Sequence, residues 1–204
     1  YSDALMSDMI RTEYERHRYL RLIHREAGRM ERLVGDLLDL SKLESDEYKL
    51  EKMPLPLAQL IEDAIEKYKP FVREKGLQLH YDLDPDIIIN GDEDRIEQVL
   101  QNIMDNSLRY TKTGGINIRL YKEKDNCLID IADTGIGIPE EHLNKIKQRF
   151  YRVNKGRTRS DGGTGLGLAI AEKLVKLHQG KLIIASKVNK GTTVRITLPI
   201  LEVD

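Results

Sequence analysis

Hydrophobic residues near the start of the chain recur at alternating intervals of three and four positions. This spacing predicts a helix from about Arg11 to Glu44 with one apolar seam, as in a coiled coil or a four-helix bundle. Its length favours packing against a second helix or another subunit over a single amphipathic helix that lies on a globular core. The seam consists of Leu20, Ile23, Ala27, Met30, Val34 and Leu37.

A shorter helix is predicted before the long one, at Ser2–Ile10, and the helical pattern breaks after Tyr48. Pro54 and Pro56 remove backbone donors and disfavour helix just before them. We therefore expect a boundary between a helical unit, residues 1–50, and a second domain, residues 51–204.

Helical and strand periods alternate after this boundary. The expected helices are Leu57–Glu74, one capped by Asp92 that runs to about Tyr110, one opened by Pro139, and Leu166–His178. The expected strands are Leu77–Leu83, Ile87–Ile89, Ile116–Glu123, Cys127–Ala132, Lys181–Ser186 and Thr192–Leu198. We expect an α/β sandwich in which helices cover one face of a mostly antiparallel sheet, so that the whole chain is α+β.

The charges of the chain nearly cancel, with 33 basic and 34 acidic side chains. This balance gives no indication of binding to nucleic acid or to an anionic membrane. No apolar run approaches the roughly 20 residues that span a bilayer, so we expect any membrane attachment outside this chain. The lone cysteine, Cys127, fits a reducing, cytoplasmic compartment and a buried strand position.

Two asparagines, Asn102 and Asn106, are four residues apart on a predicted helix and therefore share a face. An amide oxygen is a hard ligand that suits Mg²⁺, which takes most of its other oxygens from phosphates and water. In isolation two solvent-facing asparagines would be the simpler interpretation, and the glycine-rich segments downstream favour the functional one.

Asp133 ends a predicted strand just before Gly135 and Gly137. A carboxylate at this place can accept a hydrogen bond from an exocyclic amine such as that of adenine. The glycines let a base approach the backbone closely. An ordinary strand-to-helix turn is the alternative.

A second glycine-rich segment, residues 162–168, precedes a predicted helix, where exposed amides and the helix dipole suit a polyphosphate. No Gly-Lys-Ser/Thr follows, so it is not a P-loop, and neither glycine segment completes the Rossmann pattern. Arg109 follows the asparagines, and a basic, aperiodic loop carries Lys155, Arg157 and Arg159. Such cations stabilise the charge of a transferring phosphoryl group.

These segments together resemble the sensor histidine kinases of two-component systems, which belong to a wider ATPase group that includes DNA gyrase and heat-shock chaperones. The resemblance covers essentially the whole chain. Residues 97–111 are similar to the N-box of the family, 133–139 to its first glycine box, 149–153 to its phenylalanine box, 163–168 to its second glycine box and 190–193 to its closing glycine-threonine turn. Residues 36–44 are similar to the end of the second helix of its dimerisation and phosphotransfer domain.

The resemblance implies a site for ATP and Mg²⁺, with a lid between Glu140 and Gly165. Asn106 would bind Mg²⁺, Asn102 and Arg109 would join it in catalysis, and Asp133 would recognise adenine. The further nucleotide contacts that it implies are Tyr110, Gly135, Gly137, Gly163, Thr164, Gly165, Leu166, Gly167 and Thr193.

The resemblance also implies a homodimer through the N-terminal helices, and a response-regulator receiver domain as partner. The γ-phosphoryl group would pass to a histidine and then to an aspartate of the regulator. The acceptor motif, His-Glu-Leu-Arg-Thr-Pro or a relative, follows neither His17 nor His24. We therefore expect the acceptor upstream of Tyr1, on a first helix whose end is residues 1–10.

Some positions depart from the family pattern. Arg109 and Ser107 stand where the N-box has lysine and alanine, and Lys147 and Gln148 where the phenylalanine box has phenylalanine and glutamate. Two other functions stay open. An ATP-hydrolysing clamp of the gyrase or chaperone kind commonly has a glutamate where Asn102 stands, and a non-catalytic nucleotide-binding scaffold would need no acceptor histidine.

Overall fold

The computed structural model of the chain describes residues 2–6, 12–45, 47–153 and 163–201. Its helices are α1 (Ser2–Met6), α2 (Glu13–Glu44), α3 (Leu57–Glu74), α4 (Glu93–Tyr110), α5 (Glu140–Leu143) and α6 (Gly167–Leu177). Its strands are β1 (Met53–Pro56), β2 (Gln78–Leu83), β3 (Ile88–Gly91), β4 (Gly115–Glu123), β5 (Asn126–Asp133), β6 (Lys181–Lys187) and β7 (Gly191–Pro199). The predicted α+β fold is confirmed.

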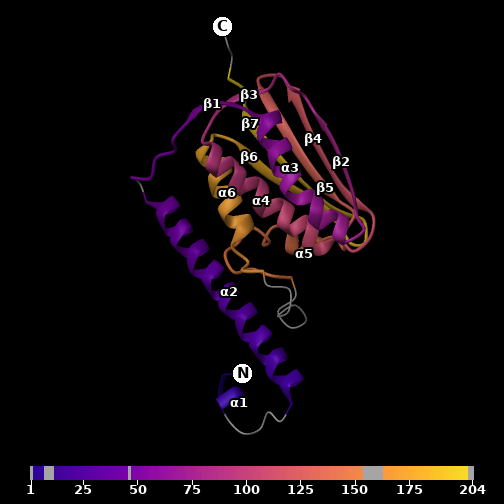
Figure 1. The fold of residues 1–204 in the computed structure, drawn as a ribbon. Coiled ribbons are helices and arrows are strands. Elements are labelled where there is room, and N and C mark those ends of the chain that lie inside the picture. The colour runs from indigo at the N-terminus through magenta and orange to yellow at the C-terminus, as the bar shows by residue number, and fades with distance from the viewer. Residues whose placement is uncertain (1, 7–11, 46, 154–162, 202–204) are drawn as a thin grey trace.

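The main sheet has five strands in the order β2-β4-β5-β7-β6, and α3, α4 and α6 cover one of its faces (Figure 1). β2 and β4 run parallel, and the other neighbours are antiparallel, as expected. β1 and β3 form a separate antiparallel pair. β1 was not predicted, because Pro54 and Pro56 argue against a strand in the middle of a sheet. A two-stranded edge tolerates them.

The core lies between the sheet and its helices. In β4, Ile116, Ile118 and Leu120 alternate with exposed residues, and all three are buried against the helices. The strand period of two therefore places every second side chain in the core. Ile129 and Ile131 of β5 are buried beside them. Burial of each such side chain contributes about 1.5–3 kcal/mol.

The opposite face of the sheet buries a carboxylate beneath two arginines. The Arg195 guanidinium donates to both oxygens of Asp130, from Nε at 2.7 Å and from Nη2 at 2.8 Å. Arg119 and the hydroxyl of Tyr121 donate to Asp130 as well, each at 3.2 Å. The hydrogen bonds and charge of Arg195 hold the pKa of Asp130 below its ordinary value. Asp130 therefore ties β5 to both neighbouring strands.

The long helix α2 presents different faces to the domain and to solvent. Leu40 and Leu43 are buried against the domain, and α2 contacts α6. Of the predicted seam, Leu20, Ala27, Met30, Val34 and Leu37 are exposed and Ile23 is half-buried. The N-terminal part of α2 extends away from the sheet domain, with α1 near its end (Figure 1). The seam is thus available to a second helix.

Most predicted helix boundaries are confirmed. α3 spans the predicted residues and is followed by Gly76 in the left-handed region (φ 66°), where glycine is favoured. The Asp92 carboxylate caps α4 by accepting the N–H of Arg95 at 3.2 Å. α1 ends at Met6, and residues 7–10 of the predicted first helix lie outside the described residues. No helix in the described ranges is both long and apolar enough to cross a membrane.

His178 joins the end of α6 to the start of α4. Its Nε2 accepts the backbone N–H of Asp92 at 3.0 Å, and its Nδ1 lies 2.8 Å from the carbonyl oxygen of Leu174. These partners require a neutral ring with the proton on Nδ1. Burial lowers the pKa of His178 below its usual value of 6.5.

His178 should make folding depend on pH. The unfolded chain protonates this ring near pH 6.5 and the folded chain only at lower pH, so stability is complete above 6.5 and falls as pH drops below it. We expect His178→Gln to lose about 1 kcal/mol at pH 7 and to have a flatter pH dependence between pH 7 and 5. Urea unfolding measures both. His80→Gln, at an exposed position, is the control. If the free energy of unfolding changed equally with pH in the unmutated chain and in both variants, the assignment to His178 would be wrong.

Candidate functional site

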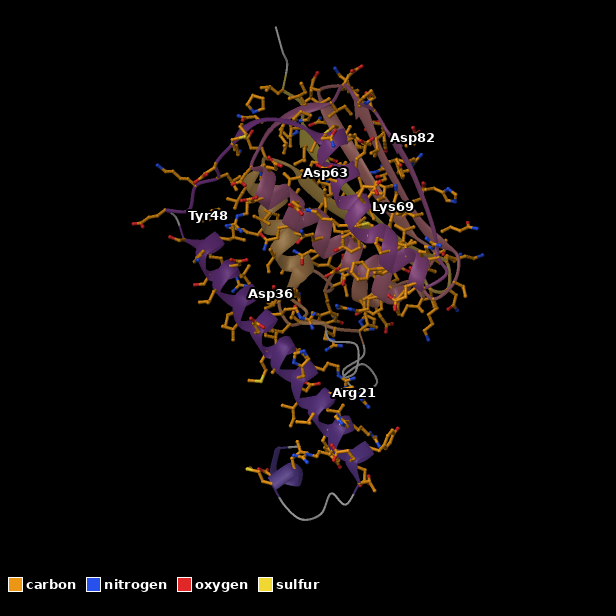
Figure 2. The ribbon with its side chains drawn as sticks, viewed as in Figure 1. Arg21, Asp36, Tyr48, Asp63, Lys69 and Asp82 are labelled. Carbon is orange, nitrogen blue, oxygen red and sulfur yellow. The ribbon has the colours of Figure 1, made fainter. Side chains whose placement is uncertain are left out.

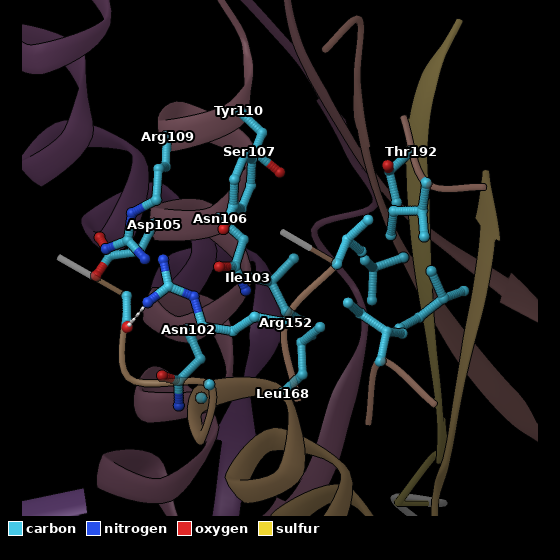
Figure 3. Close-up of a pocket in the computed structure, with 18 of the residues that line it drawn as sticks. Asn102, Ile103, Asp105, Asn106, Ser107, Arg109, Tyr110, Arg152, Leu168 and Thr192 are labelled. Atoms are coloured by element: carbon cyan, nitrogen blue, oxygen red, sulfur yellow. Dashed lines mark hydrogen bonds between the residues drawn. The ribbon is translucent and has the colours of Figure 1, made fainter. Parts of the chain in front are cut away.

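A cavity of about 250 Å³ lies at the junction of α4, α6, the sheet and α2. Figure 3 shows 18 of the residues that line it. Its polar lining residues are Arg32, Asp36, Asn102, Asp105, Asn106, Ser107, Arg109, Tyr110, Asp133, Tyr151, Arg152, Thr164 and Thr192. Its other lining residues are Ile103, Ile136, Gly137, Ile138, Ile146, Val153, Gly163, Gly165, Gly167, Leu168, Ile184 and Val194.

α4 supplies the side chains of one wall. Buried Val99 and Ile103 fix the rotation of the helix against the core. Asn102, Asn106 and Arg109 then project along a neighbouring face, since positions three and four apart lie above one another on a helix. All three line the cavity (Figure 3), and for Asn102 and Asn106 the sequence predicted a shared face.

Asp133 lies at the end of β5, on another wall. One of its oxygens accepts the backbone N–H of Gly135 at 2.8 Å, and the other accepts the hydroxyl of Ser107 at 3.4 Å. Burial raises the pKa of Asp133, and hydrogen bonds from Gly135, Thr192 and Ser107 oppose this rise. None of these donors is a cation. A carboxylate has about four acceptor sites, so the hydrogen bonds from Gly135, Ser107 and Thr192 leave capacity for a further donor.

Two glycines allow the backbone to close around Asp133. Gly137 has φ 68° and Gly191 has φ 100°, both in the left-handed region. A Cβ at Gly137 would collide with the carbonyl oxygen of Lys187, and one at Gly191 would collide with that of Asp133 itself. The glycine-rich turn after β5 thus packs directly on the turn between β6 and β7.

The start of α6 borders the other end of the cavity. Arg152 Nη1 donates to the carbonyl of Gly163 at 3.1 Å (Figure 3), and the Arg109 guanidinium lies close to the same glycine. A Cβ at Gly167 would lie 2.6 Å from the Asn102 amide oxygen. The N-cap residue, Leu166, has an apolar side chain that makes no hydrogen bond to the N–H groups of the helix. The cavity therefore has cationic and amide groups at this end and the Asp133 carboxylate at the other.

Several predicted contacts do not line the cavity. Thr192 lines the cavity and Thr193 does not, because strand residues alternate between faces and buried Val194 places the even-numbered positions on the helix side. Leu166 is a core residue with no exposed surface. Gly135 acts through its N–H on Asp133 and is not a lining residue. Tyr110, Gly137, Gly163, Thr164, Gly165 and Gly167 do line it.

The predicted lid, from Glu140 to Gly165, is described in part. Lys147, which departs from the family pattern, forms an ion pair of 2.6 Å with Glu172 of α6, and Arg149 pairs with Glu44 of α2. Phe150 is exposed. This segment is thus connected to the domain and to α2 through charges. Gly162 and the predicted loop cations Lys155, Arg157 and Arg159 lie outside the described residues.

Several residues that line the cavity were not predicted from the sequence. The hydroxyl of Ser107 could have been found from its place in the helical pattern, three residues before Tyr110 and four after Ile103. No local sequence pattern indicates that Arg32 and Asp36 line the cavity, because they reach it only through the packing of α2 against the sheet domain.

The described residues contain no cluster of three or more His, Cys, Asp or Glu side chains that could hold a metal. Asn106 lines the cavity, and its amide oxygen suits Mg²⁺ whose other ligands are phosphate oxygens and water. Asn106 therefore fits a metal ion that is bound mainly by the phosphates of a nucleotide.

Two family comparisons match the chain. Residues 91–202 match the histidine kinase-, DNA gyrase B-, and HSP90-like ATPase family. Residues 1–46 match the His Kinase A (phospho-acceptor) domain.

Curated relatives match nearly the whole chain. It is 40% identical over 189 residues to the sensor histidine kinase WalK of Bacillus subtilis. This alignment covers 91% of the present chain and 31% of WalK. It is 34% identical over 200 residues to the sensor protein SrrB of Staphylococcus aureus, which covers 98% of this chain and 34% of SrrB. The chain therefore spans about a third of the length of these relatives.

Solved structures share the fold. Full-length ShkA in complex with AMPPNP has a TM-score of 0.79 at 25% identity and covers 96% of this chain and 41% of its own. The histidine kinase ThkA in complex with the response regulator TrrA has a TM-score of 0.78 at 24% identity, covering 95% and 54%.

If Asp133 recognises a base amine, Asp133→Asn should weaken binding of adenosine and of ATP by about tenfold, because the neutral amide is a weaker acceptor than a carboxylate. In the unmutated chain, the affinity for both ligands should begin to fall at a higher pH than it would with an ordinary aspartate. The reason is that the pKa of Asp133 is raised, and protonation of its carboxylate removes the charged acceptor. Calorimetry over a pH series measures both effects. The exposed Asp125→Asn should change neither, and ATP affinity in Asp133→Asn equal to that of the unmutated chain would exclude this role.

Proposed function

The chain belongs to the histidine kinase-, DNA gyrase B- and HSP90-like ATPases, and within them to the sensor histidine kinases, and from this membership we propose that it is the ATP-dependent kinase core of a two-component sensor. The observation that carries the proposal is the arrangement of the cavity. At one end lies a half-buried carboxylate, Asp133, with no cationic partner among the described residues. At the other end lie amides and arginines, on α4 and in the segment before α6.

Asp133 would accept a hydrogen bond from the exocyclic amine of adenine, held in place by Ser107 and Gly135. The apolar side chains of Ile138 and Ile184 line the cavity and would contact the base. Guanine presents a carbonyl where adenine presents its amine, so the same carboxylate would reject it.

Arg109 and Arg152 would bind the polyphosphate, and the uncapped N–H groups at the start of α6 would add donors. Asn106 would give one oxygen ligand to Mg²⁺, and Asn102 would support the metal or a phosphate. Bound Mg²⁺ supplies charge neutralisation between phosphate oxygens. The contribution of the residues themselves is positioning and charge stabilisation, which is most of what phosphoryl transfer requires.

The γ-phosphoryl group would pass to a neutral histidine imidazole and then to an aspartate of a response-regulator receiver domain. The solved complex of ThkA with its regulator, which shares this fold, supports such a partner. The exposed seam of α2 and the match to the phospho-acceptor domain support a homodimer through the N-terminal helices. Neither His17 nor His24 carries the acceptor motif, so we expect the acceptor outside residues 1–204.

The gyrase and chaperone clamps are less well supported as a function. Hydrolysis by that route uses a carboxylate to activate water, and Asn102, at the position where such a base is expected, has only an amide.

ATP labelled on its γ-phosphate tests the proposal. With Mg²⁺, we expect acid-labile, alkali-stable label on a longer piece of the protein that includes the preceding helix, and none on this chain alone. Asn106→Ala in the longer piece should reduce labelling at least about a hundredfold, because it removes an oxygen ligand that acts on the reacting phosphates. Asn117→Ala, at an exposed position of β4, is the matched control.

Other outcomes assign the chain differently. Label on this chain alone would place the acceptor at His17 or His24. ATP binding with no label on either piece would favour a nucleotide-binding scaffold. Steady release of phosphate without label on protein would favour a hydrolysing clamp.

A further inference from the structure

α2 brings one arginine and one carboxylate into the cavity. Arg32 and Asp36 lie one helical turn apart, and both line it. Figure 2 shows Asp36 on the part of α2 that passes close to the sheet domain, whereas Arg21 lies nearer the N-terminal end of the helix and farther from that domain. Neither residue belongs to the segments that the sequence associates with nucleotide binding, so the cavity includes a contribution from the helical unit.

Asp36 is bound to the second glycine-rich segment. Its carboxylate accepts a hydrogen bond from the Thr164 hydroxyl, and Thr164 Oγ1 in turn accepts the N–H of Leu166 at 3.3 Å. Asp36 is half-buried, and burial raises its pKa while the bond from Thr164 lowers it. An anion from α2 thus occupies a donor at the start of α6.

Arg32 is exposed and has the opposite charge. Its Nε donates to the carbonyl of Gly28, one turn earlier, at 3.2 Å. It lines the same cavity as Arg109 and Arg152. A polyphosphate in the cavity would therefore meet cations from α4, from the segment before α6 and from α2.

We propose that Arg32 and Asp36 are part of the nucleotide site, with Arg32 in contact with the polyphosphate and Asp36 bound to Thr164 until the polyphosphate displaces it. The inference rests on the proposed function, because it requires ATP in this cavity. A carboxylate and a phosphate repel one another at the same donor. Asp36 would then lower the affinity for ATP and Arg32 would raise it, and neither would affect a ligand without phosphates.

Calorimetry on the full chain with Mg·ATP and with adenosine tests this. Asp36→Asn keeps an oxygen acceptor for Thr164 and removes only the charge, so Mg·ATP should bind about fivefold more tightly. Arg32→Gln should weaken Mg·ATP binding about fivefold, the size of one partly exposed charge interaction. Adenosine should bind all of these proteins equally.

Asp39→Asn is the matched control. Asp39 Oδ2 accepts from Gln98 Nε2 at 3.0 Å, so this carboxylate ties the same helix to α4 but does not line the cavity. It should leave the affinity for both ligands unchanged. Thermal unfolding of each variant checks that the fold is retained.

Opposite results overturn the inference. If Asp36→Asn leaves ATP affinity unchanged or lowers it, or if Asp39→Asn shifts it equally, the two residues serve only to dock α2. If adenosine affinity changes in parallel with that of ATP, the effect does not arise from phosphate. The unmutated chain distinguishes the two proposals, since failure to bind either ligand removes the proposed function, and normal binding without variant effects removes only this inference.

Discussion

The packing of α4 against α6 and the sheet is the contact on which the candidate site depends. Ile96, Leu100 and Ile103 are buried on one side of α4, which fixes its rotation about its own axis. Asn102 can then face only the cavity, and Gly167 has no side chain at the point where the amide meets α6. A Cβ on that glycine would lie 2.6 Å from the Asn102 amide oxygen, so the amide would have to move from its place. The contact that builds the core therefore also sets the distance between the amides of α4 and the start of α6.

The sheet domain contains two carboxylates whose burial is compensated in different ways. Asp130 is matched by the bidentate guanidinium of Arg195 and by Arg119, so its negative charge is satisfied within the protein and its pKa is lowered. Asp133 is half-buried, its donors among the described residues are all neutral, and burial raises its pKa. Removing a carboxylate from water without a cation beside it is costly. Carboxylates of this kind are concentrated at sites where a bound ligand supplies the missing hydrogen-bond donor. Asp133 is therefore a candidate ligand contact, whereas Asp130 stabilises the sheet.

Much of the fold could be predicted because local rules agree with tertiary structure. α3 ends where Gly76 allows a left-handed turn, and the strands follow an alternation that one buried face requires. β1 could not be predicted, since Pro54 is acceptable only at an edge that the sequence does not reveal. For Thr193, similarity to a turn identified the right segment, but only the register with Val194 shows that Thr192 faces the cavity. The contact between Asp36 and Thr164 could not be predicted from local patterns, because it depends on how α2, which is distant in sequence, packs on the sheet domain.

The two ends of the cavity are consequently built to different degrees. At the base end, Asp133, Gly137 and Gly191 are fixed by the sheet and by backbone contacts that leave no room for a Cβ. At the proposed phosphate end, the groups come from three separate elements: α4, the segment before α6, and α2. If the proposed function holds, affinity for a base would be a property of the sheet domain alone. Affinity for phosphates would depend in addition on where α2 lies, so movement of that helix would alter the electrostatic environment of the group to be transferred.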